Sequence, residues 1–557
     1  MEMGVNMGEV TGKAAAAPVD GVFDAVVIGA GIGGLYAVYK MREMGLSVLG
    51  IEAGEDVGGV WYWNRYPGAR CDLMTIDYCY TFSPQVDAEW TWSEQFATQG
   101  EILQYVNFVA DRHALRKEYL FDTRVDSAVY DDARQVWVYR TSTGKTFEAT
   151  YAIMATGPLS VPKVPEFENM AAFKGELYYS GRWPRHPVSY AGKRIGVVGV
   201  GSTGIQIIPV VAKEAAEVVV FQRTPSFTLP MRNHTFTPEY QAEIRRNLAG
   251  MRASAKLSPL GGVRPASTRP FFSLPPEQRR ELMEHGWKNG GHTFLGSFCD
   301  LLTNREANDE VAEFVREKIG EVVNDPETAE VLKPRGYPIF ARRACLDTHY
   351  YETYNQPHVK LVNCFKEPII GLTENGVQTS EREIEIDMLI LATGYDGLTG
   401  ALMAFDVVGR GGKTINEAWE GGAHSYLGLM MQDFPNMFMI CGPNGPSALA
   451  NIFTINEQNV NWLADAIAHM RAHGLTAMEP TGAAEQEWMD LVAELADRTL
   501  VSKANTWYTG TNIAGKARGL TIYTGGFKAY RETCDEVVAD EYRGLVFERI
   551  GTHEHAT

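Results

Sequence analysis

The chain has 557 residues and a formal net charge of −18, and 45% of its residues are hydrophobic while 22% are charged. This length predicts more than one domain. The acidic excess disfavours binding to nucleic acid or to an anionic membrane surface, because phosphate recognition needs clustered Lys and Arg.

Two βαβ units are predicted from apolar runs that end in glycines. We expect residues 1–21 to be a mobile N-terminal tail. A strand at 23–28, a helix at 35–44 and a strand at 47–51 then follow in order. The same order recurs far along the chain, at 194–198, 205–212 and 217–221. Two such units predict two nucleotide-binding domains.

The middle of the chain has a different composition. Pro and charged residues increase between about 225 and 335, and helices are predicted there at 238–251, 276–287 and 309–323. We interpret this stretch as a helical insert. A strand is predicted at 384–392, followed by helices at 457–473 and 484–500.

The first βαβ unit carries the glycines of a dinucleotide-binding loop, Gly29, Gly31 and Gly34. These glycines permit a tight turn, a close backbone approach to pyrophosphate and tight packing of helix on strand. Glu52 ends the second strand, where a carboxylate can accept hydrogen bonds from both ribose hydroxyls. The unit is therefore predicted to bind FAD or NAD.

The second unit repeats the glycine pattern with a different residue after its second strand. Its loop, GVGSTG, contains Gly199, Gly201, Ser202, Thr203 and Gly204. Arg223 stands where the first unit has Glu52, and Thr224 follows it. A guanidinium suits a 2′-phosphate through charge-assisted hydrogen bonds. This pattern favours NADPH over NADH, so one unit would hold a flavin that the other reduces.

Two longer motifs carry a family resemblance. They are GGVWYWNRYPGARCD, from Gly58 to Asp72, and FKGELYYSGRWP, from Phe173 to Pro184. Together with ATG at 155–157, LATGYD at 391–396, GPNGPSAL at 442–449 and WYTGTNIAGK from Trp507, they resemble the Baeyer–Villiger monooxygenases over residues 22–549. The family usually has His where Tyr179 stands, which leaves the subfamily and the coupling between domains open.

The resemblance implies an α/β fold with two Rossmann-like dinucleotide-binding domains. An FAD-binding domain would be discontinuous, with residues 22–157 and 387–549, and the chain would cross between domains at the two ATG segments. An NADPH-binding domain would cover 158–386 and contain the helical insert.

The resemblance also implies a reaction. NADPH reduces FAD, reduced FAD and O2 give a C4a-peroxyflavin, and a ketone, which we expect to be cyclic, becomes an ester or lactone. Arg343 matches the catalytic arginine and Asp72 the acid that holds and orients it. A fixed cation is needed where negative charge develops on the reacting oxygen. Arg342 and Trp507 match contacts of the nicotinamide cofactor.

Further residues are assigned by the same resemblance. The expected FAD contacts are Gly59, Val60, Trp61, Asp72, Tyr78 and Val125, and the expected substrate pocket is Leu159, Ser447, Ala448, Leu449 and Phe453.

An alternative function is that of a flavin monooxygenase that acts mainly on N or S atoms. A disulfide reductase is disfavoured, since Cys71 and Cys79 lack C-x4-C spacing. A redox-sensing or scaffold flavoprotein without turnover is a third possibility.

Cofactors other than FAD and NADPH are not expected, and no metal site is predicted, because no His, Cys and carboxylate cluster has ligand spacing. Seven cysteines without a C-x-x-C pair fit free thiols in a cytoplasmic protein. We found no apolar run long enough to span a membrane. We expect a monomer or a weak homo-oligomer.

Overall fold

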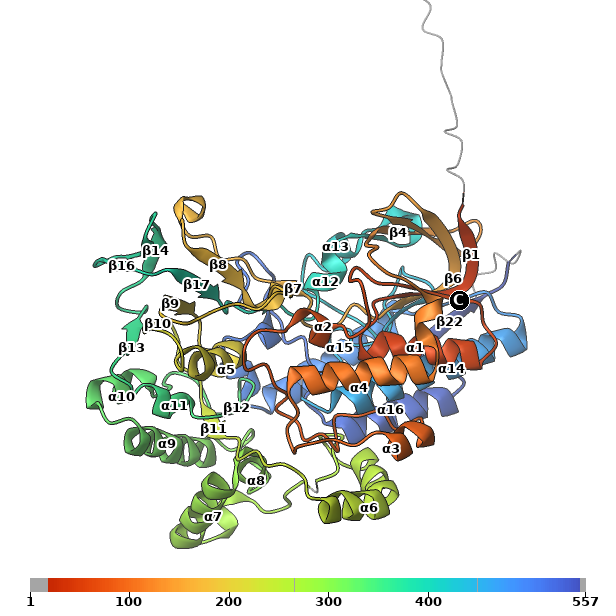
Figure 1. The fold of residues 1–557 in the computed structure, drawn as a ribbon. Helices are drawn as coiled ribbons and strands as arrows, with labels where there is room; N and C mark the ends of the chain where they lie inside the picture. The colour runs from red at the N-terminus through yellow and green to blue at the C-terminus, as the bar shows by residue number, and fades with distance from the viewer. Residues whose placement is uncertain (1–18, 265, 448, 551–557) are drawn as a thin grey trace, which may run out of the picture.

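The structure is a computed structural model that describes residues 19–264, 266–447 and 449–550. Most of the expected N-terminal tail therefore lies outside the described residues, and Gly21 already begins β1 (Gly21–Ile28). Two α/β units lie side by side, each built on its own sheet (Figure 1). The predicted fold class is confirmed.

The first unit is built on an eight-stranded sheet. Its order is β19-β4-β5-β6-β1-β2-β3, and β20 also pairs with β6. The strands β1, β2, β3, β6 and β20 are joined by parallel pairings, whereas β4, β5 and β6 form an antiparallel meander. The bounds are β2 Val48–Ile51, β3 Tyr119–Leu120, β4 Val125–Asp131, β5 Val136–Thr141, β6 Thr146–Met154, β19 Asp406–Val408 and β20 Met437–Met439.

Helices cover the first sheet and come from both ends of the chain. The most extensive packing among them is between α1 (Ile32–Glu43) and α14 (Ile452–His473), two segments far apart in sequence. The other helices are α2 Val60–Trp63, α3 Pro84–Glu89, α4 Gln99–Arg112, α12 Gly400–Met403, α13 Ile415–Ala418, α15 Gly482–Asp497 and α16 Phe527–Ala539.

The second unit is built on a parallel five-stranded sheet with the order β13-β10-β9-β17-β8. The bounds are β8 Glu176–Tyr179, β9 Arg194–Val198, β10 Glu217–Gln222, β13 Val359–Asn363 and β17 Met388–Leu391. We had predicted one strand at 384–392. The chain instead turns at Ile386 and Asp387, so that β16 (Glu383–Glu385) and β17 belong to different sheets. Because β17 pairs with β8 and β9, we propose that the chain returns to the first unit after Leu391 and not at 387.

The helical insert lies below the second sheet in Figure 1. Side-chain caps set the start of its longer helices: Thr237 accepts from the Tyr240 N–H, and Asn304 from the Ala307 N–H. The helices of this unit are α5 Ser202–Val211, α6 Pro238–Lys256, α7 Pro276–Asn289, α8 Gly291–Leu295, α9 Arg305–Val322, α10 Pro326–Leu332 and α11 Tyr350–Thr353.

The two chain crossings between the units form one antiparallel ribbon. In it β7 (Val161–Pro162) pairs with β18 (Tyr395–Asp396). The Lys163 N–H donates to the Gly394 carbonyl at 2.8 Å, and the Leu398 N–H donates to the Pro158 carbonyl at 2.8 Å. The crossings therefore move as a pair and not as two independent linkers.

Smaller elements complete the fold. The remaining strands form short ribbons: β11 Thr228–Pro230 with β12 Cys345–Asp347, β14 Ile369–Leu372 with β15 Gly376–Thr379 and β16, and β21 Ala477–Pro480 with β22 Leu545–Glu548. The 3-10 helices are η1 Leu115–Glu118, η2 Met170–Ala172, η3 Ser180–Arg182, η4 Phe271–Ser273, η5 Arg410–Gly412, η6 Val501–Lys503 and η7 Trp507–Thr509.

Candidate functional site

The first glycine loop is shaped by backbone contacts that exclude side chains. Gly29 has φ +111°, and a Cβ on it would lie 2.5 Å from the Ala155 carbonyl oxygen. A Cβ on Gly34 would lie 1.9 Å from the Gly29 carbonyl oxygen. The N-cap of α1, Gly31, makes no side-chain cap. The free N–H groups and positive end of this helix suit a phosphate group.

Glu52 is held at the end of β2 with its carboxylate turned to the loop. It is 6% exposed, and its two oxygens accept the Ala30 and Gly54 N–H groups, each at 2.7 Å. Burial raises its pKa, while these N–H groups lower it. Hydrogen bonds from the Trp63 side chain and the Ala53 N–H also lower this pKa, and a carboxylate offers about four lone-pair sites in all. Ribose hydroxyls would therefore share these sites with the protein donors.

The first family motif packs against this loop. Gly59 has φ +54°, and a Cβ on it would lie 2.6 Å from the Gly31 Cα. Val60 and Trp61 follow in α2, and the Trp61 Nε1–H donates to the Tyr78 hydroxyl at 2.9 Å. The structure thus brings these expected FAD contacts to one place. Val125 begins β4 and is 4% exposed in the core beneath the sheet.

The second glycine loop reproduces the first. Gly199 has φ +102°, and a Cβ on it would lie 2.5 Å from the Ala392 carbonyl oxygen. A Cβ on Gly204 would lie 2.0 Å from the Gly199 carbonyl oxygen, whereas one on Gly201 would meet nothing within 4 Å. The α5 N-terminus has no side-chain cap. The N–H groups at the start of this helix are thus left without a side-chain cap, as in α1.

Side chains of α5 tie this loop to its surroundings. The Ser202 hydroxyl lies 3.1 Å from the Cys345 Sγ. Three residues after Thr203 on α5, Gln206 accepts at its Oε1 a hydrogen bond of 2.9 Å from the hydroxyl of Tyr66, which belongs to the first family motif. The second loop therefore abuts the first unit, as two cofactors that exchange a hydride would require.

Three cations gather beyond the end of β10. Arg342 stacks on the Tyr337 ring at 4.2 Å, and its Nε is buried without a hydrogen-bond partner. Burial lowers the pKa of Arg342, and the nearby charge of Arg223 lowers it further. The pKa of Lys163 is lowered by the same two causes. Within the described residues none of the three forms an ion pair with a carboxylate. Such a cluster suits a doubly charged phosphate.

Lys163 was not found by the sequence analysis. It follows β7 on the chain crossing, about sixty residues before Arg223, and no motif marks it. Only the fold brings it to the other two cations. Thr224 follows Arg223 and is half-buried.

Arg343 lies where three segments meet. It precedes β12, and its pKa reflects Asp72 from the first unit, Tyr508 from the C-terminal segment and Cys345 from its own strand. Burial lowers the pKa of Arg343, but the Asp72 charge and its other neighbours raise it by more. The side chain is nevertheless exposed. Its guanidinium stays protonated there.

Asp72 is electrostatically coupled to Arg343 without touching it. Burial raises the pKa of Asp72 to about 6, and Arg343 and the Leu346 N–H oppose this rise. The Asp72 Oδ1 is buried without a hydrogen-bond partner. Among the described residues no direct ion pair joins the two side chains. The two side chains therefore influence each other by charge without the direct contact that a holding role would predict.

The C-terminal segment closes over the chain crossings. Trp507 packs on Gly397, where an added Cβ would lie 2.7 Å from the Trp507 Cε3. The Lys163 Nζ donates to the Asn512 carbonyl at 2.7 Å, and the Asn512 Nδ2 donates to the Tyr395 carbonyl at 2.8 Å. Lys516 also pairs with Asp396. These contacts hold the segment that contains Trp507 against the two chain crossings, and one of them is made by Lys163 of the cation cluster.

The expected substrate pocket is only partly assembled. Leu159 is half-buried, Leu449 packs beside Trp507, and the buried Ser447 Oγ has no hydrogen-bond partner. Phe453 is 0% exposed between the rings of Tyr78 and Tyr80, each at 4.8 Å. It therefore supports the core and does not face a substrate, contrary to our expectation. Ala448 lies outside the described residues.

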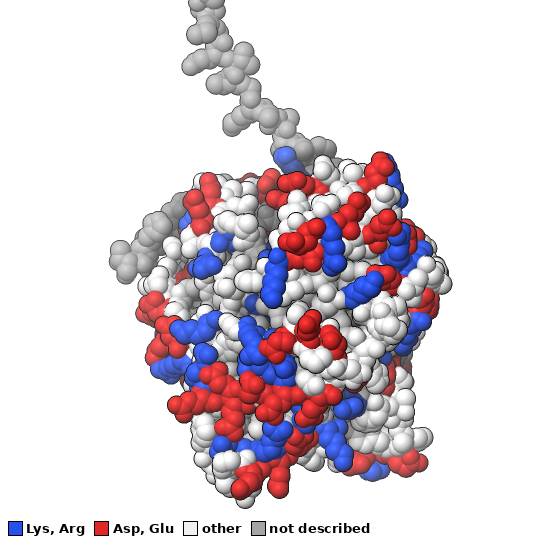
Figure 2. Space-filling model, turned by 90° about the vertical axis from the view of Figure 1, so that its left-hand side faces the viewer, with Lys and Arg blue, Asp and Glu red and all other residues white. Residues whose placement is uncertain are grey.

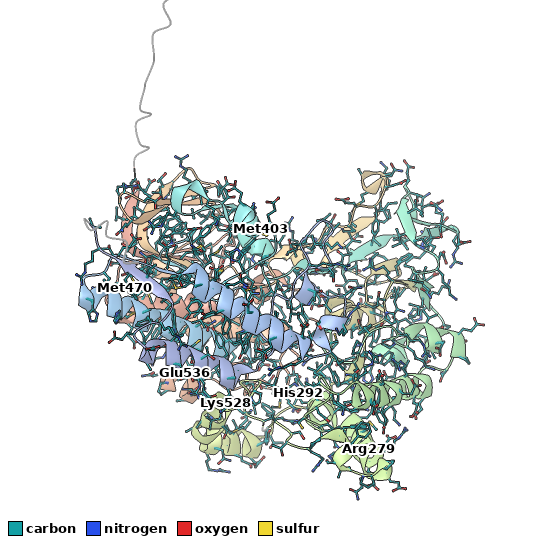
Figure 3. The ribbon with its side chains drawn as sticks, turned by 180° about the vertical axis from the view of Figure 1, so that it is seen from behind. Arg279, His292, Met403, Met470, Lys528 and Glu536 are labelled. Carbon is teal, nitrogen blue, oxygen red and sulfur yellow. The ribbon has the colours of Figure 1, made fainter. Side chains whose placement is uncertain are left out.

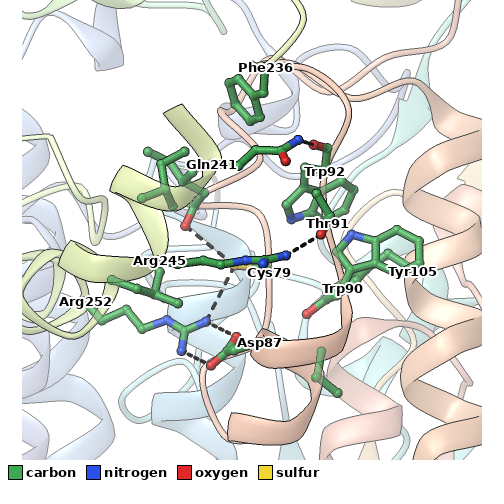
Figure 4. A pocket seen from close by; sticks show the side chains of 14 residues that line it. Cys79, Asp87, Trp90, Thr91, Trp92, Tyr105, Phe236, Gln241, Arg245 and Arg252 are labelled. Carbon is green, nitrogen blue, oxygen red and sulfur yellow. Dashed lines mark hydrogen bonds and ion pairs between the residues drawn. The ribbon is translucent and has the colours of Figure 1, made fainter. Parts of the chain in front are cut away.

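Two hollows lie apart from these residues. One of about 450 Å³ separates the units behind α5 and is lined by Tyr66, Gly100, Pro209, Leu346 and others. The other, of about 70 Å³, lies between α6 and the segment around Trp90 (Figure 4). Arg252 crosses its wall to pair with Asp87. The residues that line them include neither Arg343 nor the glycines of the two dinucleotide-binding loops.

A basic stripe, a membrane span and a metal site each require a recognisable group of residues. Figure 2 shows Lys, Arg, Asp and Glu interspersed on the face that it presents, without a continuous basic stripe. Within residues 19–264, 266–447 and 449–550, no helix is long and apolar enough to cross a membrane. The same residues contain no group of three or more His, Cys, Asp and Glu that could hold a metal ion.

Comparison with known proteins identifies relatives over nearly the whole chain. Residues 24–244 match the family described as flavin-binding monooxygenase-like. A Baeyer–Villiger monooxygenase of Pseudooceanicola batsensis is 40% identical over 95% of this chain and 96% of its own. A phenazine N-monooxygenase of Lysobacter antibioticus is 37% identical over 94% and 97%. The solved structure of oxidized steroid monooxygenase bound to NADP is 43% identical, covers 95% of this chain and 100% of its own, and superimposes with a TM-score of 0.91.

Proposed function

Because the chain belongs to the Baeyer–Villiger monooxygenases, we propose that the exposed side chain of Arg343 marks its oxygenation site. Members of the family bind FAD and NADP. When bound, the reduced flavin and O2 supply the oxidising equivalent that converts a ketone into an ester or lactone. The observation that carries the assignment is the convergence of Arg343 and Asp72 between the two glycine loops.

The first unit supplies the FAD site. The open α1 N-terminus would take the pyrophosphate, and Glu52 would accept the ribose hydroxyls. Gly31 and Gly59 approach each other so closely that a side chain on Gly59 would close this cradle. Trp61 and Tyr78, joined by their hydrogen bond, would form a rigid wall beside the flavin. Val125 would contact the flavin only from beneath the sheet.

The second unit supplies the NADPH site. The α5 N-terminus would take the pyrophosphate, while Arg223, Arg342 and Lys163 would surround the 2′-phosphate. The unpaired Nε of Arg342 supports this assignment, since a buried donor without a partner is costly. Trp507 and Thr224 would complete the contacts.

Arg343 would stabilise the negative charge that develops on oxygen during attack on the ketone. Its guanidinium stays protonated, so it stabilises the oxyanion without giving up a proton. Asp72 would hold the guanidinium by attraction. Since the pKa of Asp72 is about 6, its carboxylate is mainly ionised at neutral pH and can play this part.

The substrate is proposed to be a cyclic ketone. Similar enzymes are named for cyclohexanone and cyclopentanone, and the half-buried Leu159 and Leu449 offer apolar surface for such a ring. A second candidate, oxygenation of nitrogen or sulfur, is favoured by the phenazine N-monooxygenase relative. The two candidates share the same cofactors and differ in the acceptor atom.

We expect the purified, FAD-loaded protein to consume NADPH faster when cyclohexanone is added, and to form a product heavier by one oxygen atom. NADPH absorbance and mass spectrometry measure the two quantities. A thioether and an aromatic amine are offered in parallel. Oxygenation of these two with no ester from any ketone would overturn the ketone assignment in favour of the second candidate.

Replacing Arg223 by alanine should weaken NADPH more than NADH. Removal of one charge-assisted phosphate contact costs about 1.5–3 kcal/mol, so we expect the KM for NADPH to rise about tenfold to a hundredfold. The KM for NADH should change less than about threefold, because NADH has no 2′-phosphate. Lys360→Ala is a matched control, since that exposed lysine pairs with Glu217 on the same sheet. An equal rise of the KM for NADPH and for NADH would contradict the assignment of Arg223 to the 2′-phosphate.

A further inference from the structure

His292 connects the helical insert to the segment that carries Asp72. It lies in α8, and its Nε2 is 2.6 Å from the Asp72 carbonyl oxygen, 220 residues earlier in the chain. Figure 3 places His292 between the two units. The bond therefore joins the first unit to the second at the residue next to the proposed oxygenation site.

The position of His292 is fixed by close packing of α8. Gly290 has φ +103°, and a Cβ on Gly291 would lie 2.1 Å from the Leu346 Cδ2. The α8 backbone thus rests directly on β12, the strand that follows Arg343. The His292 ring also packs 5.4 Å from the Phe96 ring of the first unit. The imidazole consequently has little freedom to turn away from Asp72.

The imidazole must donate to Asp72. A backbone carbonyl only accepts, so the hydrogen lies on Nε2. Burial, helped by the charges of Arg264 and Arg343, lowers the pKa of His292 to about 4, and the hydrogen bond to Asp72 only partly opposes this. The ring is therefore neutral near pH 7. A lysine or arginine at this position would add another cation close to Arg343 and compete for the Asp72 carboxylate.

We propose that His292 is a positioning residue, which fixes the Asp72 backbone so that its carboxylate faces Arg343 across the boundary between the units. The inference rests on the proposed oxygenation site. Asp72 needs such support because its Oδ1 has no partner and no direct ion pair with Arg343 fixes its side chain within the described residues. A residue of the insert would thereby control a residue of the other unit.

The test compares His292→Leu, which removes the donor, with His292→Gln, which keeps a side-chain N–H. Each FAD-loaded variant is assayed for ester and hydrogen peroxide per NADPH consumed. Loss of one hydrogen bond typically changes an equilibrium about twofold to tenfold, so His292→Leu should lower the ester-to-peroxide ratio by about that factor. His292→Gln should restore the ratio to within about twofold of the wild type.

Two further comparisons separate positioning from general damage. His285→Leu is the matched control, because His285 is exposed on the same insert and, within the described residues, its ring hydrogen-bonds only with Asn289 of its own helix. In an Asp72→Asn background, His292→Leu should have little additional effect, since the two residues act in one chain of contacts.

Three results would overturn the proposal: an unchanged ratio in His292→Leu, no rescue by His292→Gln, or full additivity with Asp72→Asn. If His292→Leu does not retain FAD, His292→Phe takes its place, because it keeps a ring against Phe96 and lacks the N–H donor. A wild-type protein that makes no ester from any ketone would instead reject the proposed function, and the two failures are therefore distinguishable.

Discussion

Arg343→Ala should keep its FAD and lose its ability to make ester. Removing one donor to a developing oxyanion typically costs about 10²–10³ in rate, and removing a full charge should cost at least that. The first glycine loop, Glu52 and the Trp61–Tyr78 pair are unaffected by the change, so flavin binding should persist. NADPH oxidation should continue and yield hydrogen peroxide.

The measurement is the rate of ester formation at saturating NADPH and ketone, with the flavin spectrum taken on the same sample. Arg343→Lys tests the geometry, because a lysine keeps the charge but not the planar fork. Arg335→Ala is the control, since that exposed arginine pairs only with Glu330. Wild-type ester formation by Arg343→Ala would remove Arg343 from the mechanism.

The individual helices, strands and glycine loops could be predicted because each depends on residues that are close together in the sequence. The glycine loops, the strands on each side of them and the insert helices with Pro at their starts all follow from short-range rules. The predicted 194–198 strand and β9 coincide, and α6 starts at the predicted Pro238. The family, the flavin monooxygenase function and the two cofactors, inferred from motifs, were confirmed by the comparisons.

The joins between units were harder to predict because no local rule fixes them. The run 384–392 reads as one apolar strand, but Asp387 accepts hydrogen bonds from Arg194 and turns the chain into the second sheet. Lys163 reaches the cation cluster only because β7 and β18 pair. His292 reaches Asp72 only through the packing of α8 on β12.

Side-chain direction was the other limit. Phe453 was expected to line the substrate pocket, and it lies in the first turn of α14. In the fold its ring is enclosed by Tyr78 and Tyr80. Whether a side chain at the start of a helix points into the core or into a cavity depends on how the helix is rotated about its axis. The sequence does not specify that rotation. The roles of the individual site residues therefore remain predictions that depend on the variants described above.

Gly29→Ala should prevent stable FAD binding. Its φ of +111° is one that L-residues rarely adopt, and the added Cβ would lie 2.5 Å from a backbone oxygen, that of Ala155. The atoms that the added Cβ would meet belong to the backbone and not to a flexible side chain. The β1–α1 turn or the end of β6 must therefore move. Strain of this kind costs about 1–3 kcal/mol, which is about a tenfold to a hundredfold loss of flavin affinity.

The flavin content of the purified variant and its FAD dissociation constant measure this loss. Gly250→Ala is the matched control: Gly250 lies within α6, an added Cβ meets nothing within 4 Å, and alanine favours a helix. Normal FAD affinity in Gly29→Ala would mean that the turn can relax without disturbing the α1 N-terminus. The pyrophosphate would then depend on groups other than this helix end. Loss of FAD with an intact second unit, seen as retained NADPH binding, would instead indicate that the two glycine loops act as separate sites joined by the paired crossings.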